Sequence, residues 1–134
     1  MKRLALLLAV ATAPAAAFSE GVAEGLLADY RAAGAGPFSA NGGAEAWQRQ
    51  VAAGNGEAPR SCATCHGADP RSAGRHAKTG KVIDPLAPAA NPARLTDAAT
   101  IEKWFRRNCE WTWGRVCTPQ EKGDFLSYLN SYRP

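Results

Sequence analysis

The sequence predicts an all-α fold, in which one small helical domain carries a single long loop. Apolar residues recur at helical spacing in four segments, whereas the alternating pattern of strands is almost absent. The chain has 134 residues, and about 117 remain after the expected removal of an N-terminal leader. That length suits one domain with one core.

The chain begins with a segment, residues 1–17, that has the composition of a secretory signal peptide. A short positive start is followed by the apolar run LALLLAVA and by APAAA, which ends in an Ala-x-Ala cleavage pattern. A retained membrane anchor is the alternative, but the apolar run is too short to span a bilayer. We expect cleavage after Ala17 and export to the periplasm, which leaves residues 18–134 as a single domain.

The first two predicted helices span residues 19–36 and 39–53. Their apolar faces consist of Val22, Leu26, Leu27, Tyr30, Ala44, Trp47 and Val51. The turn-forming stretch GNGEAP at 54–59 ends the second helix.

A long loop and two further helices complete the predicted domain. Residues 72–92 are rich in proline and glycine and form the loop, whose length is consistent with wrapping a large cofactor. The third helix covers residues 96–109, with Thr96 or Asp97 as its N-cap and Ile101, Trp104 and Phe105 on one face. The fourth covers residues 118–134 and opens with a capping box of Thr118 and Glu121 around Pro119.

The stretch RSCATCHGAD at residues 60–69 contains the motif Cys62-x-x-Cys65-His66. A structural zinc site needs four ligands, and this run is too tight for the usual geometry. A thioredoxin-like dithiol belongs to a mixed α/β fold, whose strands are missing here. C-x-x-C-H in an exported helical chain is typical of covalent haem c, with Cys62 and Cys65 as thioethers and His66 as the proximal iron ligand.

The second axial ligand decides much of what a haem protein does. The sequence contains one methionine, Met1, which leaves with the leader, so a His/Met electron carrier is excluded. His76 is a chemically strong candidate, although an exposed loop histidine is the simpler interpretation. Asn108 shares the apolar face of Ile101 and Trp104, where an amide needs a partner. It is either a helix C-cap or an iron ligand.

The remaining cysteines and the charges add two expectations. Once haem has consumed the first pair, Cys109 and Cys117 remain to form a disulfide, as suits an oxidising compartment.

The whole chain has 16 basic and 12 acidic residues, and removing the two basic residues of the leader leaves 14 against 12. This balance argues against nucleic acid as a partner. A local basic cluster in the loop could steer an acidic protein, and consists of Arg71, Arg75, Lys78 and Lys81.

Four stretches together resemble one known family, the sphaeroides haem protein group of oxygen-binding, high-spin c-type cytochromes. These stretches are SCATCHGAD (61–69), KTGKVIDPLAP (78–88), TD…IEKWFRRNC (96–109) and GRVCTPQEK (114–122). The resemblance covers the chain from Ser61 to its end and is weak before it. It implies a cytochrome c-like helical domain around one covalent haem.

The resemblance also implies roles for individual residues. Asn108 would be the distal ligand of ferric iron, would leave on reduction and would open the site to O₂, NO or CO. Cys109 and Cys117 would form the family disulfide. Trp104, with Trp111 and Trp113, would line the distal pocket. Electron partners would be a dihaem cytochrome c or a membrane cytochrome b.

Three functions are therefore compatible with the sequence. The first is a periplasmic redox protein that binds diatomic ligands and is not an enzyme. The second is a simple electron carrier with His66 and His76 on the iron. The third is a small peroxidase or a nitric-oxide-consuming enzyme, which needs a distal acid or base, and His76 is the only obvious candidate in the sequence.

Overall fold

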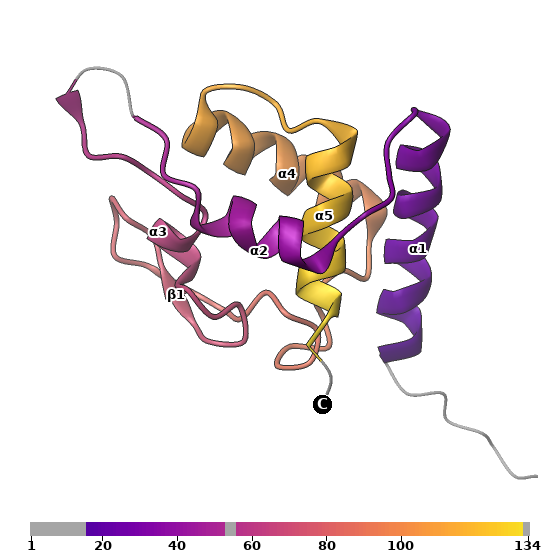
Figure 1. The fold of residues 1–134 in the computed structure, drawn as a ribbon. Helices are drawn as coiled ribbons and strands as arrows, with labels where there is room; N and C mark the ends of the chain where they lie inside the picture. Colours follow the sequence, from indigo (N-terminus) through magenta and orange to yellow (C-terminus); the bar gives the residue numbers. More distant parts are fainter. Residues whose placement is uncertain (1–15, 53–55, 133–134) are drawn as a thin grey trace, which may run out of the picture.

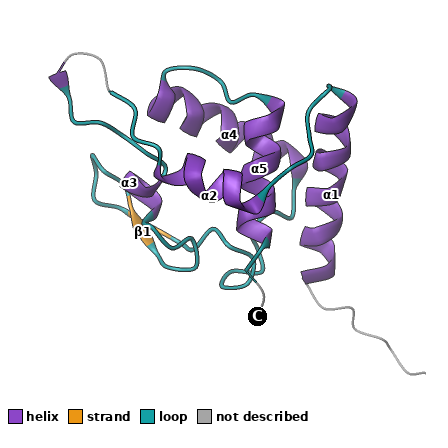
Figure 2. Cartoon of the chain, viewed as in Figure 1, coloured by secondary structure: helices purple, strands orange, loops and turns teal. Residues whose placement is uncertain are grey.

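The computed structural model describes residues 16–52 and 56–132 of the chain. The predicted leader, residues 1–17, lies almost wholly outside them, so its removal stays a prediction. In the described parts the elements, in chain order, are α1 (Ala16–Ala32), α2 (Ala40–Gln48), α3 (Ala63–His66), β1 (Gly74–Arg75), β2 (Val82–Ile83), α4 (Ala98–Trp113) and α5 (Pro119–Asn130). Helices dominate the chain (Figure 2), which confirms the all-α prediction.

Helix α5 is the central element of the domain and packs against both α1 and α2 (Figure 1). It begins with the predicted capping box, in which the Thr118 hydroxyl accepts from the Glu121 N–H and the Glu121 carboxylate accepts from the Thr118 N–H. Helix α2 approaches it very closely at Gly43, where a Cβ would overlap the carbonyl oxygen of Asp124. Glycine at this position is therefore what allows the two helices to cross.

Two adjacent residues of α5 join two hydrophobic clusters. Phe125 belongs to the first cluster, which consists of Ala46, Trp47, Cys109, Cys117, Phe125, Tyr128 and Leu129. Leu126 belongs to the second, which consists of Leu26, Tyr30, Ile101 and Leu126. Because α5 supplies both, it ties α1 and α4 on one side to α2 and the cysteine motif on the other. Burial of Leu26, Tyr30 and Trp47 confirms the apolar faces predicted for the first two helices.

Several element boundaries differ from the prediction. The helices predicted over 19–36 and 118–134 end earlier, at Ala32 and Asn130. The helix predicted over 39–53 ends at Gln48, and Val51 instead forms an isolated antiparallel bridge with Arg60. The helix predicted over 96–109 starts at its Asp97 cap but continues to Trp113, where Gly114 ends it with a φ of 68°. The loop over 72–92 contains a two-stranded antiparallel pairing, Gly74 with Ile83 and Arg75 with Val82.

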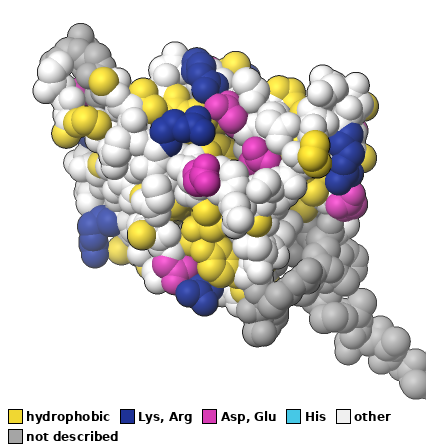
Figure 3. Space-filling view, viewed as in Figure 1, with side chains coloured by type: hydrophobic (Ala, Val, Ile, Leu, Met, Phe, Trp, Pro, Cys, Tyr) yellow, Lys and Arg dark blue, Asp and Glu magenta, His cyan; other side chains and the backbone are white. Residues whose placement is uncertain are grey.

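Two observations bear on the surface. Within residues 16–52 and 56–132, no helix combines the length and apolar character needed to cross a membrane. On the face shown in Figure 3, basic and acidic side chains alternate around apolar patches, so no field of one sign covers that face.

Candidate haem site

The cysteine motif lies on a single helical turn. The carbonyl of Cys62 accepts hydrogen bonds from the backbone N–H groups of Cys65 (3.3 Å) and His66 (3.1 Å). This turn places all three side chains on one side, because residues three and four apart share a helix face. Gly67 then reverses the chain with a φ of 76°, and its carbonyl accepts a 2.8 Å hydrogen bond from the Trp47 indole N–H. Helix α2 thus anchors the end of the motif.

The chemistry of the motif fits covalent haem better than thiolate chemistry. Burial raises the pKa of the Cys62 thiol to about 12, which disfavours the thiolate that zinc binding or disulfide exchange requires. Burial, and then the charge of Arg94, lower the pKa of His66 to about 4. His66 is therefore a neutral imidazole, the form that binds iron. No three His, Cys, Asp or Glu side chains gather into a metal-holding group in the described part of the chain.

A cavity of about 720 Å³ opens directly onto the motif. This lies within the range of about 300–1,000 Å³ that small-molecule and cofactor pockets occupy. Cys62, Cys65 and His66 line one side of it. Trp104 and Asn108, both on α4, line the same cavity. The residues predicted as attachment points, as proximal ligand and as distal ligand therefore share one space.

Asn108 occupies the interior of α4, and the C-cap interpretation is wrong. The helix continues for five residues beyond it to Trp113, and Gly114 is the cap. Its side chain is half-buried and lines the cavity, and among the residues that the structure describes no hydrogen bond reaches its amide. The amide is not among the fully buried side-chain groups without a partner, so it can remain unpaired in the open cavity. The arrangement leaves the amide available to a group inside the cavity.

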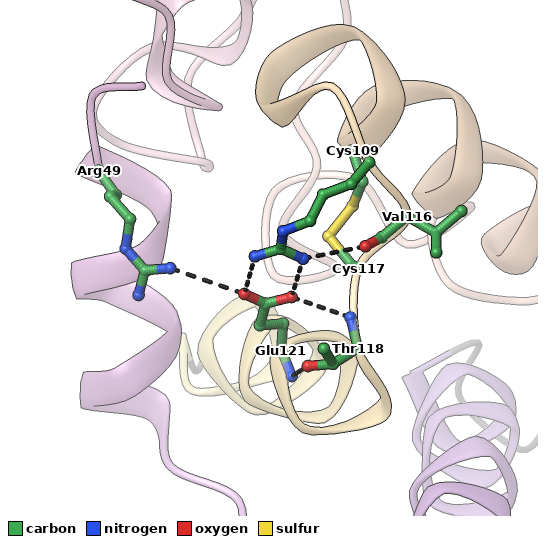
Figure 4. Close-up of polar contacts among 7 residues, drawn as sticks. Arg49, Cys109, Val116, Cys117, Thr118 and Glu121 are labelled. Carbon is green, nitrogen blue, oxygen red and sulfur yellow. Dashed lines mark hydrogen bonds and ion pairs between the residues drawn. A yellow bond between two sulfur atoms is a disulfide. The ribbon is translucent and has the colours of Figure 1, made fainter. Parts of the chain in front are cut away.

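The end of α4 that follows Asn108 is held in place at the turn into α5. Cys109 and Cys117 are paired as a disulfide with Cα atoms 5.6 Å apart, as the sequence predicts. Below it, the Glu121 carboxylate accepts two hydrogen bonds from Arg115 (2.7 and 2.9 Å) and one from the Thr118 N–H (2.9 Å), as Figure 4 shows. Arg49 of the α2 end lies 3.6 Å from the same carboxylate.

His76 lines the same cavity, but its Nδ1 is already engaged in hydrogen bonds with the backbone. It follows β1, and its Nδ1 accepts hydrogen bonds from the backbone N–H groups of Lys78 (3.3 Å) and Thr79 (3.2 Å). In the neutral ring an accepting Nδ1 leaves the proton on Nε2. That nitrogen then has no lone pair for iron. The geometry therefore favours Asn108 over His76 as distal ligand.

The three tryptophans predicted for the distal pocket all line the cavity, and their exposures differ. Trp104 was expected on a buried face but is 47% exposed, with Lys103 and Arg107 against its ring. Trp111 and Trp113 are half-buried. The indole N–H of Trp113 is buried and has no acceptor among the described residues.

Sequence reasoning missed three supporting residues. Arg60 directly precedes the motif and donates a 3.1 Å hydrogen bond to the carbonyl of Trp111, which links the motif to α4. Trp47 anchors Gly67, and its ring lies 5.6 Å from that of His66. Arg94 lines the same cavity as His66. No local pattern marks these residues, because their partners are distant in sequence.

A helical domain in which a C-x-x-C-H turn faces one haem-sized cavity defines the class of c-type cytochromes. The model of the family described as "Domain of unknown function (DUF1924)" matches residues 33–129. The cytochrome c-type protein SHP of Cereibacter sphaeroides is 46% identical over 129 residues, which cover 96% of this chain and 98% of that protein. This chain therefore belongs to the sphaeroides haem protein family of c-type cytochromes, and the predicted family is confirmed.

Solved structures agree with this assignment. The structure described as oxidized SHP, an oxygen binding cytochrome c, matches with a TM-score of 0.74 and 45% identity, over 82% of this chain and 96% of that one. Oxidized cytochrome c'' from Methylophilus methylotrophus matches with a TM-score of 0.76 and 29% identity, over 89% and 98% of the two chains. The cytochrome c-like fold is thus confirmed, and the cytochrome c-type relatives imply covalent haem c as the cofactor.

Proposed function

We propose that this protein is an exported monohaem cytochrome that exchanges electrons and binds a small diatomic ligand when Asn108 leaves the iron. Cys62 and Cys65 would hold the haem covalently, and His66 would be its proximal ligand. The haem would supply a redox-active iron, which His66 would hold from its side of the cavity. The observation that carries the proposal is the cavity shared by His66 and the unpaired amide of Asn108.

The nature of Asn108 supports redox gating. A neutral amide oxygen is a weak, hard ligand, which suits ferric iron better than ferrous iron. Reduction would therefore release it, and the disulfide at Cys109 would keep its helix in place while the side chain moves. Trp104, Trp111 and Trp113 would limit the entry of water to this side of the cavity.

The cellular location and the electron partners follow from the same proposal. The leader at residues 1–17 supports a periplasmic location, where the electron partner would be a dihaem cytochrome c or a membrane cytochrome b. Arg75, Lys78 and Lys81 are exposed on the hairpin beside Cys65 and would meet an acidic partner surface. Cell fractionation and N-terminal sequencing should find the protein in the periplasm, beginning at Phe18.

The distal ligand is tested by comparing Asn108→Ala with His76→Ala in the holoprotein. We expect Asn108→Ala to leave ferric iron five-coordinate or water-bound and to speed the binding of added azide or cyanide. Binding of CO by the ferrous protein should change little, because Asn108 has left by then. Absorption and electron-spin-resonance spectra provide the measurement, and a pyridine haemochrome assay should give one haem per chain.

His76→Ala is the matched control and decides the alternative. We expect it to leave the ferric spectrum intact. Should this substitution instead convert a low-spin ferric spectrum to high spin, the protein is a bis-His electron carrier and the ligand-binding proposal is wrong.

A further inference from the structure

Arg60 is fixed at the entry to the cysteine motif, two residues before Cys62. In its bridge with Val51, the Val51 N–H donates to the Arg60 carbonyl at 2.8 Å, and the Arg60 N–H donates to the Val51 carbonyl at 2.9 Å. The Arg60 side chain is 17% exposed and forms an ion pair with Glu57. The guanidinium therefore extends from a fixed point beside the motif and has a carboxylate that holds its orientation.

The same guanidinium contacts the last turn of α4 in two ways. Its Nη1 donates a 3.1 Å hydrogen bond to the carbonyl of Trp111, and its Cζ lies 4.4 Å from the centroid of the Trp111 ring. The last four carbonyls of an α-helix have no partner within the helix, and Trp111 is among these four residues because α4 ends at Trp113. A basic side chain at such a carbonyl also interacts favourably with the helix dipole, and stacking on the indole adds a cation–π contact. Arg60 thus caps α4 from another part of the chain.

This contact acts one turn away from the predicted distal ligand. Trp111 follows Asn108 by three residues on α4, so the two residues are neighbours on the helix surface. Both line the cavity that Cys62 and His66 also line. Arg60 itself does not line this cavity, so any effect that it has on a ligand inside must pass through α4.

The link differs in kind from those at the other end of α4. The disulfide of Cys109 with Cys117 joins the helix to the segment that leads into α5. Arg60 instead joins α4 to the cysteine motif itself. An iron held by His66 moves with the motif, so the distance from Asn108 to that iron depends on this second link.

We propose that Arg60 is a positioning residue that sets the separation of α4 from the cysteine motif and so keeps Asn108 within reach of an iron held by His66. The inference rests on the proposed function, because it takes His66 and Asn108 as the two axial ligands. It deepens that function by assigning to Arg60 the control of how readily the amide is displaced.

The test measures azide binding to the ferric, haem-loaded protein by stopped-flow absorption. Azide must displace the distal amide, so its binding rate reports how firmly Asn108 is held. We expect Arg60→Gln to raise this rate about tenfold, because a charged hydrogen bond and a cation–π contact are lost. Arg60→Lys keeps the charge and loses the planar fork, so its rate should lie between those of wild type and Arg60→Gln. CO binding to the ferrous protein should be unchanged, because Asn108 has left the iron by then.

Hydrogen exchange in the same proteins separates positioning from general destabilisation. Arg60→Gln should speed exchange in the last turn of α4, residues 109–113, and leave α1 unchanged. Arg71→Gln is the matched control, since Arg71 pairs with Asp69 at 2.8 Å and lies 4.9 Å from the centroid of the Tyr132 ring. These are the same kinds of contact with partners outside α4, so this control should match wild type in both measurements.

Wild-type azide rates in the Arg60 variants would overturn the inference, while a changed ferric spectrum of Asn108→Ala would still support the proposed function. Equal acceleration in Arg71→Gln, or exchange that rises throughout the chain, would overturn the inference as well, because the effect would then be general. Arg60→Lys decides the test should Arg60→Gln fail to load haem. A wild-type ferric spectrum in Asn108→Ala would overturn the proposed function and the inference together.

Discussion

The α4–α5 corner and the α3–α4 loop are held in different ways. The α4–α5 corner, residues 109–121, combines a disulfide, a complete capping box and a carboxylate shared by Arg115 and Arg49. The α3–α4 loop, residues 67–97, is held mainly by backbone carbonyls that accept from side chains and from N–H groups. The first combines a covalent link with ion pairs that join separate elements, whereas the ion pair of the second, Arg71 with Asp69, is local and joins residues two apart.

This difference matches the ligands that each region supports. As the proposed proximal ligand, His66 would not depend on a rigid loop, because the thioethers of Cys62 and Cys65 would fix its neighbours. As the proposed distal ligand, Asn108 would bind weakly, so a small displacement of its helix would remove it. The comparison therefore assigns the more rigid scaffold to the residue proposed as the weaker ligand. Four substitutions test it, in order of decreasing expected effect.

Phe125→Ala should destabilise both the α4–α5 corner and the α3–α4 loop. Phe125 is 3% exposed, and its ring contacts those of Trp47 and Trp113, which belong to the two sides of the site. We expect a loss of about 3–5 kcal/mol in the free energy of unfolding. Guanidinium unfolding followed by circular dichroism measures it. Val116→Ala, at a residue that is 56% exposed, is the control and should be nearly neutral. A cost below that of the control would refute a shared aromatic core.

Removing the disulfide should loosen the α4–α5 corner alone. The double substitution of Cys109 and Cys117 by serine opens a loop with a sequence separation of 8, and the chain-entropy model predicts a loss of about 2–3 kcal/mol. The ferric spectrum should also shift toward that of Asn108→Ala as Asn108 loses its fixed position. An unchanged ferric spectrum would show that the disulfide stabilises the fold without positioning the ligand.

Gly74→Ala should disturb the α3–α4 loop. A Cβ at this position would overlap the carbonyl oxygen of Cys65 and crowd the Cα of His66, so the strand must move away from the motif. We expect a cost of about 1–3 kcal/mol in unfolding free energy and a lower yield of covalent haem. Gly25→Ala is the control, since nothing lies within 4 Å of a Cβ there, and it should be neutral or stabilising. Equal yields of haem from both variants would contradict the close packing of β1 on the motif.

Glu121→Gln should have the smallest effect and a dependence on pH. The hydrogen bond from Arg115 is the main cause that lowers the pKa of Glu121 from 4.5 to about 2. Its stabilising effect is therefore complete above pH 4.5 and is lost as the pH falls toward 2. Glutamine keeps the capping acceptor and loses the charge, so we expect a cost of about 1 kcal/mol at neutral pH.

Thermal unfolding between pH 2 and pH 7 measures this difference. The gap between wild type and Glu121→Gln should close on acidification. Glu24→Gln, in an exposed pair with Arg31, is the matched control and should show almost no gap at any pH. A gap that stays constant down to pH 2 would mean that the Glu121 charge does not stabilise the corner.

Local signals in the sequence predicted several parts of the molecule correctly. Asp97 and Thr118 cap their helices as expected, because a cap depends on residues only three positions apart. The end of α4 was predicted too early, since Asn108 and Cys109 resemble a helix end in isolation. Contacts of Trp113 with Phe125 accompany the longer helix, and the glycine at position 114 ends it only there.

The sequence by itself determined the attachment chemistry, because Cys62, Cys65 and His66 need only one helical turn to face the same side. It also determined the pairing of the two remaining cysteines, by elimination. Only the tertiary structure decided that Asn108 and Arg94 line the same cavity as this turn and that His76 has its Nδ1 occupied. These relations join residues that are distant in the chain, and they exist only because α5 packs α4 and α2 around one core.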